Sequence, residues 1–138
     1  MVRLLVLDQS RILLWRIGRE APEELVILPA FKIREAERLI RDDPPDAAVV
    51  SLTPAQIDWR AFQRLCATRR PPVPVLYESC VHSAAEEIGL DAADGYAAFL
   101  PKPAPLADLR RAIGELLAEA CRTRRARLAA EINAPPRS

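Results

Sequence analysis

The sequence is poor in the residues that build metal sites, disulfide scaffolds and glycine-rich phosphate loops. Its 138 residues include one histidine, three cysteines and four glycines. Cys66, Cys80 and Cys121 are widely spaced and form no CxxC pair, so neither a structural zinc site nor a disulfide framework is expected. Three unpaired thiols are typical of a reducing compartment, and the sequence therefore predicts a cytoplasmic protein.

Long apolar runs are also missing. No stretch approaches the ~20 apolar residues that a membrane-spanning helix needs. The apolar run at the N-terminus is interrupted by Asp8 and Arg11, and no small-residue cleavage site follows it, so a signal peptide is not expected. The 20 basic and 19 acidic residues nearly cancel, which argues against a protein coated by nucleic acid or bound to a membrane surface.

Short apolar runs alternate with helical patterns along the chain. The runs show little polar alternation, which is typical of strands buried on both faces of a parallel sheet. Right-handed crossovers then give a doubly wound five-stranded parallel sheet, a (βα)5 arrangement of the α/β class. Strands are expected over residues 3–8, 24–28, 47–52, 73–77 and 96–100, and helices over residues 10–20, 33–40, 58–68, 83–88 and from Leu106 onward.

The last helix carries the strongest amphipathic pattern and predicts the domain organisation. Residues 1–120 are expected to form one domain, because the apolar stripe of this helix ends at Ala120. The helical pattern continues weakly through residues 121–138, which hold five arginines and one glutamate. An Arg-rich helical extension with a frayed end is therefore expected, and helicity to Glu131 would give a helix of ~39 Å. The stripe consists of Leu106, Leu109, Ile113, Leu116, Leu117 and Ala120.

Polar side chains follow several of the expected strands. Asp8 and Gln9 follow the first strand, and Ser51 lies at the end of the third. Glu78 and Ser79 follow the fourth strand, and Lys102 follows the fifth. Ligand sites of doubly wound sheets form beyond the carboxyl ends of the strands. These residues are therefore the candidates for a functional site.

The order of these elements resembles the receiver domain of bacterial response regulators, a flavodoxin-like, CheY-like family, over about residues 2–120. The third strand has Pro45-Asp46, an apolar run and then Ser51-Leu52, where the family has the same pattern with Asp in place of Ser. The stretch GYAAFLPKP from Gly95 to Pro103 matches the family's glycine, aromatic and Lys-Pro. This resemblance implies a signalling protein of the two-component type.

The resemblance also implies a role for each candidate residue. In the family, the third-strand Asp accepts a phosphoryl group and an acidic pair holds Mg²⁺. A lysine senses the phosphate there, and a Ser or Thr with an aromatic residue relays the change. The corresponding residues here are Asp8 and Gln9 for the acidic pair, Ser51, Lys102, Phe99 as the switch aromatic, and Ser79 or, in an alternative register, Tyr77.

The departures from the family pattern predict a degenerate phosphorylation pocket. Ser51 is not a carboxylate nucleophile and needs a base beside it, and Gln9 is neutral. One carboxylate, Asp8, would remain of three, so we expect little Mg²⁺ binding, no phosphoaspartate chemistry, no cofactor and no enzymatic activity. Lys102 is expected to pair with Asp8 and to fix one conformation without phosphate.

The sequence thus predicts a pseudo-receiver that acts through protein contacts, with a protein partner or a second copy of the chain. The family's usual partner face corresponds to residues 86–99 and 106–119. Trp15 is expected at the edge of the core. Trp59 is expected in the loop near the pocket, either covering the pocket or lying on the surface.

Other functions remain open on the sequence alone. The Arg-rich tail could bind DNA, although a short charge run is more often a solvated helix end. A small flavodoxin-like ligand-binding protein or enzyme is a further alternative, but no strand is followed by a glycine-rich loop. A Ser/His hydrolase would need Ser51 beside His82, and no GxSxG motif accompanies them.

Overall fold

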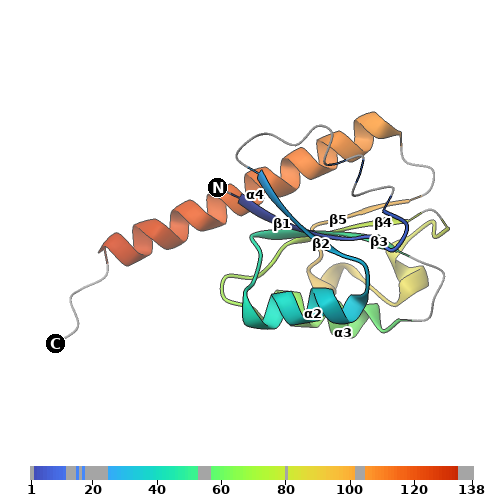
Figure 1. Ribbon diagram of the computed structural model, residues 1–138, viewed down its shortest axis with the longest axis horizontal. Coiled ribbons are helices and arrows are strands. Elements are labelled where there is room, and N and C mark those ends of the chain that lie inside the picture. Colours follow the sequence, from blue (N-terminus) through green and yellow to red (C-terminus); the bar gives the residue numbers. More distant parts are fainter. Residues whose placement is uncertain are drawn as a thin grey trace.

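The structure is a computed structural model that describes residues 2–11, 15, 17, 25–52, 57–79, 81–101 and 105–133, with the backbone alone for Leu106. Its centre is one sheet in the order β2-β1-β3-β4-β5, in which every neighbouring pair is parallel. The sequence-based fold class, a doubly wound five-stranded parallel sheet, is confirmed (Figure 1). The strands are β1 (Val2–Leu7), β2 (Leu25–Ala30), β3 (Ala47–Leu52), β4 (Val75–Ser79) and β5 (Ala98–Leu100).

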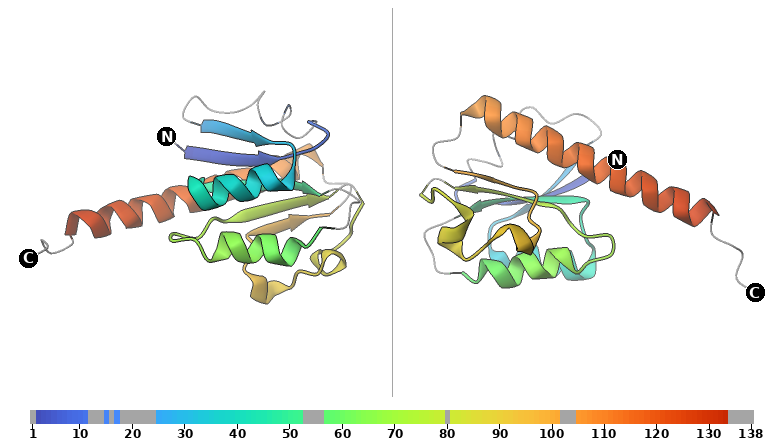
Figure 2. Two further views of the ribbon diagram at one scale, coloured as in Figure 1. Left: turned by 60° about the horizontal axis from the view of Figure 1, so that its bottom comes forward. Right: turned by 180° about the vertical axis from the view of Figure 1, so that it is seen from behind.

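Helices cover both faces of this sheet. Helices α2 (Ile33–Asp42) and α3 (Trp59–Ala67) lie on one face, and α4 (Leu106–Asn133) crosses the other (Figures 1 and 2). Trp15 and Ile17 are helical, as expected for the first helix, but the rest of residues 12–24 lies outside the described part of the chain. No helix within the described ranges is long and apolar enough to cross a membrane.

The alternation of side chains along the strands divides the core into two layers. Leu5, Val50 and Tyr77 pack against the α2 and α3 side, whereas Leu4 and Val49 pack against the α4 side. All five side chains are fully buried. Burial of each such side chain stabilises the fold by roughly 1.5–3 kcal/mol. This two-sided burial explains why the strands lack polar alternation.

Trp59 lies in the core and not over the site, so both sequence-based interpretations of this residue are wrong. Asp58 caps α3 by accepting a hydrogen bond from the Ala61 backbone N–H at 3.0 Å, which makes Trp59 the first helical residue. The Trp59 ring then meets Phe62 and Tyr77 edge to face, at centroid distances of 5.8 and 6.1 Å. The side chain is 3% exposed.

Polar groups near this aromatic cluster are neutral and hydrogen-bonded. The Tyr77 hydroxyl donates to Gln63 Oε1 at 2.8 Å, and Gln63 Nε2 donates to the Asp94 carbonyl at 3.1 Å. Burial raises the pKa of the Tyr77 phenol and raises the pKa of the Cys66 thiol to about 12. These groups therefore add a specific contact without burying a charge.

The segment between β4 and β5 differs from the expected helix over residues 83–88. Two short 3₁₀ turns, η1 (Ala85–Ile88) and η2 (Ala92–Asp94), lie in this segment. Each turn ends at a glycine with positive φ, Gly89 at 84° and Gly95 at 77°, which a helix cannot continue through. The short helix expected over residues 83–88 is therefore present as the 3₁₀ turn η1, two residues shorter than expected, and η2 is an additional turn.

Two further expectations are corrected by the structure. Strand β4 begins two residues later than expected, at Val75, because Pro74 has no N–H to donate to the ladder. The strand continues to Ser79. Trp15, expected at the core edge, is 61% exposed.

Helix α4 extends beyond the sheet that it covers. Leu109, Leu116 and Ala120 are buried against the sheet, whereas Leu128 and Ile132 are 49% and 81% exposed. The helix has 28 residues and a length of ~42 Å, and its C-terminal part projects from the domain (Figure 1). Residue 120 lies inside this continuous helix, and residues 134–138 are outside the described part.

Candidate functional site at the carboxyl edge of the sheet

The carboxyl ends of β1, β3 and β4 meet at one edge of the sheet and carry the candidate residues. Pairing of β3 with β4 places Ser51 opposite Glu78 and Leu52 opposite Ser79. Asp8 follows β1 directly, and its backbone N–H donates to the Ala30 carbonyl at 3.0 Å. The structure thus brings polar groups from three neighbouring strands to the edge that the sequence indicated.

Asp8 is held by its own loop. Its side chain is 1% exposed, and Oδ1 accepts hydrogen bonds from the Ser10 backbone N–H at 3.0 Å and from Ser10 Oγ at 2.8 Å. Gln9, the second residue of the expected acidic pair, is exposed. The predicted Asp8–Lys102 pair lies outside the described residues, because Lys102 is not among them.

Ser51 pairs with Glu78, a strand-end residue to which the sequence analysis assigned no role. Ser51 Oγ donates to Glu78 Oε2 at 3.2 Å, and the Glu78 side chain is 9% exposed. The pairing depends on the strand register, which the sequence left open between two alternatives. The available signal was a charged residue inside the otherwise buried strand VLYES.

Neither residue considered for the fourth-strand hydroxyl position lies opposite Ser51. Ser79 is one position further along, where its Oγ accepts hydrogen bonds from the backbone N–H groups of Val81 at 3.0 Å and His82 at 2.7 Å. Its Oγ is also 2.8 Å from His82 Nδ1. Tyr77 belongs to the core on the opposite face of the sheet. The Ser79 hydroxyl therefore stabilises the backbone of the loop that follows β4.

The register places a hydroxyl on β3 opposite a carboxylate on β4, because Ser51 faces Glu78. The Glu78 carboxylate accepts a hydrogen bond from the serine that stands where the receiver pattern has its acceptor Asp.

His82 and Phe99 occupy positions with structural roles. His82 contacts Ser79 and not Ser51, so the serine–histidine pair that a hydrolase would need is not formed at Ser51. Phe99 lies on β5 beside Tyr77 in register and packs, half-buried, against the core.

The donors at this edge do not fit Mg²⁺. That ion prefers hard anionic oxygens in octahedral geometry. Asp8 is hydrogen-bonded to Ser10, Glu78 is hydrogen-bonded to Ser51, and the hydroxyl of Ser51 is neutral. Within the described part of the chain, no three His, Cys, Asp or Glu side chains gather where they could hold a metal. No chemical step through a metal follows from this donor set.

The five-stranded parallel sheet and its strand order are those of response-regulator receiver domains. No model of a known family and no curated protein matches the sequence, but solved structures match the fold. The chain is similar to a CheY-like receiver domain protein from Methanospirillum hungatei JF-1, with 19% identity, a TM-score of 0.72, and coverage of 88% of this chain and 98% of that one.

Two further structures give the same result. One is the receiver domain of the Francisella response regulator 1452, with 21% identity, a TM-score of 0.68 and coverage of 89% and 99% of the two chains. The other is the non-phosphorylated HemR receiver domain from Leptospira biflexa, with 21% identity, a TM-score of 0.68 and coverage of 84% and 94%. At these identities the similarity establishes the fold, and the function has to be argued from the site.

Substitution Ser51→Asp should lower the free energy of unfolding at pH 7 by about 1–3 kcal/mol, measured by urea denaturation. The new carboxylate would face Glu78 and remove its hydrogen-bond donor. Ser51→Asn is a neutral control that still carries a hydrogen-bond donor, and it should lower the free energy of unfolding by less.

The double variant Ser51→Asp/Glu78→Ser should regain at least half of the loss, because it restores one carboxylate opposite one hydroxyl. Full stability of the single Ser51→Asp variant would contradict the observed pairing of Ser51 with Glu78.

Proposed function

We propose that this chain is a receiver-like signalling module of the two-component type that works without phosphorylation, through contacts with other proteins. The observation that carries the proposal is the hydrogen bond from Ser51 Oγ to Glu78. The position at which the family accepts a phosphoryl group holds a hydroxyl here, and that hydroxyl is already bound to a buried carboxylate.

The hydrogen bonds at the carboxyl edge support one fixed conformation. Asp8 is bound to Ser10, Ser51 to Glu78, and Ser79 to the backbone of the loop that follows it. Each polar group therefore has a partner from the protein itself. A phosphoryl group is not needed to organise this edge, and the module would keep its binding surface in a constant state.

The proposed module is not an enzyme. A carboxylate next to Ser51 is a weaker base than the histidine of a hydrolase, and an activated nucleophile also needs a third group to orient that base. We also place the module in the cytoplasm, where the free thiols of Cys66 and Cys121 would stay reduced.

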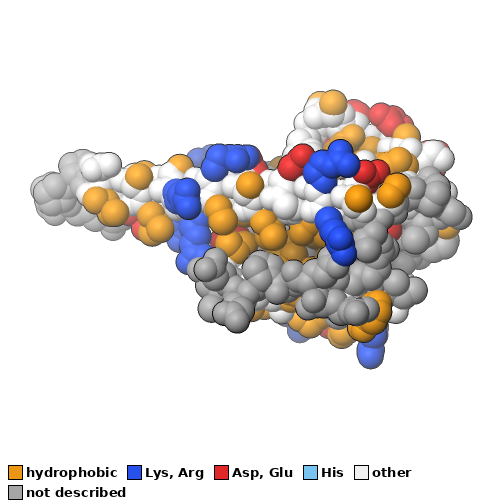
Figure 3. All heavy atoms as spheres, turned by 90° about the horizontal axis from the view of Figure 1, so that it is seen from above, with side chains coloured by type: hydrophobic (Ala, Val, Ile, Leu, Met, Phe, Trp, Pro, Cys, Tyr) orange, Lys and Arg blue, Asp and Glu red, His pale blue; other side chains and the backbone are white. Residues whose placement is uncertain are grey.

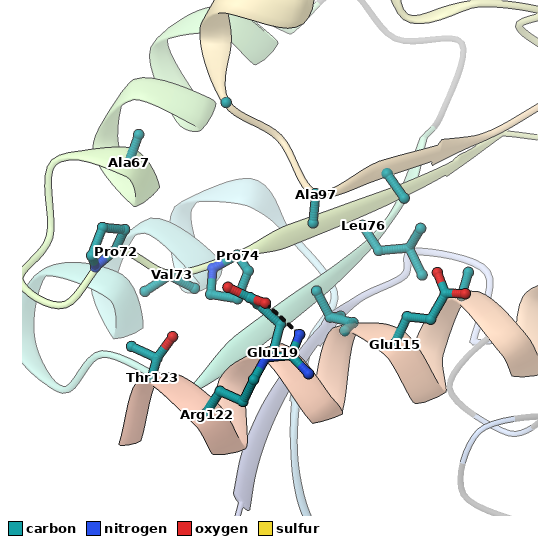
Figure 4. A pocket seen from close by; sticks show the side chains of 14 residues that line it. Ala67, Pro72, Val73, Pro74, Leu76, Ala97, Glu115, Glu119, Arg122 and Thr123 are labelled. Atoms are coloured by element: carbon teal, nitrogen blue, oxygen red, sulfur yellow. Dashed lines mark hydrogen bonds and ion pairs between the residues drawn. The ribbon is translucent and has the colours of Figure 1, made fainter. Parts of the chain in front are cut away.

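The proposed partner face includes a groove between α4 and the β4–β5 edge of the sheet. The cavity measures about 720 Å³, and Figure 4 shows Ala97 and Leu76 on one side and the residues of α4 on the other. Glu115 and Glu119 stand at its rim, and Glu119 is paired with Arg122 at 2.6 Å. Such a groove suits apolar side chains of a partner with basic residues beside them.

This groove modifies the partner face that the sequence predicted. Of the predicted residues 106–119, Ala112 and Leu116 are among those that line the groove. The predicted helix beside β5 is replaced by η1 and η2, so the groove is bordered there by Gly95 and the short edge strand β5.

DNA binding by the Arg-rich extension is supported less well. Arg122 pairs with Glu119 and Arg127 pairs with Glu131, at 2.6 and 3.3 Å. Arg124 also approaches Asp46, at 3.9 Å. Figure 3 shows the basic side chains of this face interspersed with apolar and acidic ones and not forming one continuous stripe. A phosphate backbone is held best by a continuous basic surface.

Incubation of the full chain with acetyl phosphate and Mg²⁺ should add no phosphoryl group, because Ser51 offers no carboxylate to accept it. Intact-mass spectrometry is the measurement, and a receiver domain with an intact acceptor Asp is the positive control. A stoichiometric phosphoryl adduct on the wild-type chain would overturn the proposal.

Sedimentation equilibrium should show an average mass that rises with protein concentration, with or without acetyl phosphate. Ala112→Arg should weaken this association at least fivefold, because a guanidinium would enter the apolar groove. Arg41→Gln, on the other face of the sheet, is the matched control. Equal association of Ala112→Arg and wild type would exclude the groove as the contact surface. A monomer at all concentrations would exclude self-association through it.

A further inference from the structure

A second cavity lies at the opposite edge of the sheet, where the strands begin. It measures about 430 Å³ and is enclosed by the α2–β3 loop, the α3–β4 loop and the middle of α4. Four arginines line it, together with Pro-Pro pairs at residues 44–45 and 71–72. The arginines are Arg3, Arg70, Arg124 and Arg127.

The first wall of this cavity is held in place by Arg3. Its guanidinium donates to both carboxylate oxygens of Asp43, at 3.1 and 2.7 Å, and to the Pro44 carbonyl at 3.1 Å. The Arg3 backbone N–H donates to Asp46 Oδ2 at 2.8 Å. These bonds fix the α2–β3 loop against the start of β1.

The second wall is equally well defined. The Val73 backbone N–H donates to the Cys66 carbonyl at 3.0 Å, which anchors the α3–β4 loop to the end of α3. The proline rings in both loops restrict φ and leave few alternative conformations. A cavity that is already formed loses little conformational entropy when a ligand enters.

Positive charge exceeds negative charge in the lining, with four arginines against Asp43 and Asp46. Arg3 is committed to Asp43, but Arg70 is exposed and forms no hydrogen bond or ion pair within the described ranges. Arg127 has a helical i,i+4 contact with Glu131, at 3.3 Å. An exposed pair of that kind contributes little to stability, so a stronger anion can replace it.

The remaining arginine, Arg124, lines the same cavity, and its Nη1 lies 3.9 Å from Asp46 Oδ2. Arg70, Arg124 and Arg127 therefore place three guanidinium groups around one cavity. The net charge of the whole chain is only +1, so this concentration is local.

We propose that this cavity binds a small phosphorylated molecule of about mononucleotide size. Guanidinium groups form paired hydrogen bonds with phosphate oxygens. The volume lies within the range of roughly 300–1,000 Å³ of small-molecule sites. Leu128 and the proline rings offer apolar surface to the organic part of the ligand. The site is remote from Ser51 and goes beyond the signalling role proposed above.

Titration of the ¹⁵N-labelled full chain with adenosine diphosphate tests this inference by NMR. Saturable shifts should centre on the backbone amides of Asp46, Arg70 and Thr123. Inorganic phosphate and adenosine, titrated separately, should each bind at least tenfold more weakly, because each offers only one half of the recognised chemistry. Absence of saturable shifts at these amides, or equal affinity for phosphate alone, would overturn the inference.

Matched double variants separate the cavity from general electrostatics. Arg70→Gln/Arg127→Gln should weaken binding of adenosine diphosphate at least tenfold. Arg122→Gln/Arg125→Gln removes the same amount of charge from α4 outside the cavity. This variant should change the affinity for adenosine diphosphate less than twofold. If both double variants weaken the binding of adenosine diphosphate equally, the inference that the ligand binds in this cavity is wrong.

Two further outcomes would also contradict the inference and identify an alternative. Tighter binding of a short DNA duplex that depends equally on both pairs of arginines would indicate a nucleic-acid surface on the extension. Shifts centred on Asp8, Ser51 and Glu78 would place the ligand at the carboxyl edge. Only this last outcome would also contradict the proposed function, so the two proposals fail separately.

Discussion

The register of β3 against β4 determines what the carboxyl edge of this sheet can do. Each strand is buried on both faces, so a shift by one residue would move every apolar side chain to the wrong layer. That constraint fixes Ser51 opposite Glu78 and makes their hydrogen bond a consequence of core packing. The chemistry of the edge is therefore set by the same apolar residues that stabilise the domain.

Much of the fold could be predicted because the signals are local. The run AAVVSL has no polar alternation, and it forms a central strand with the predicted bounds. The stripe on the last helix likewise predicted which residues face the sheet. The 3₁₀ form of η1 and the turn η2 were missed although Gly89 and Gly95 carry the signal, because their positive φ values become clear only from the structure.

The site could be predicted only in part, because its geometry depends on contacts between strands. Asp8 and Ser51 were found from their places at strand ends. The pairing of Glu78 with Ser51 was missed, since it follows from the register of two strands and not from the neighbours of Glu78 in sequence. Trp59 was misplaced for a related reason: the cap formed by Asp58 turns it from the loop into the core. For both Glu78 and Trp59, contacts with residues distant in the sequence determine where the side chain lies.

We propose that the carboxyl edge of this sheet does not work as a phosphorylation switch. This proposal is tested most directly by following the backbone amides of the full chain by NMR during addition of Mg²⁺, and then of Mg²⁺ with beryllium fluoride, a phosphoryl mimic. We expect no saturable shifts at Asp8, Ser51, Glu78 and Ser79. Saturable shifts centred on these residues would contradict the account and show that the edge still binds ligands as a receiver does.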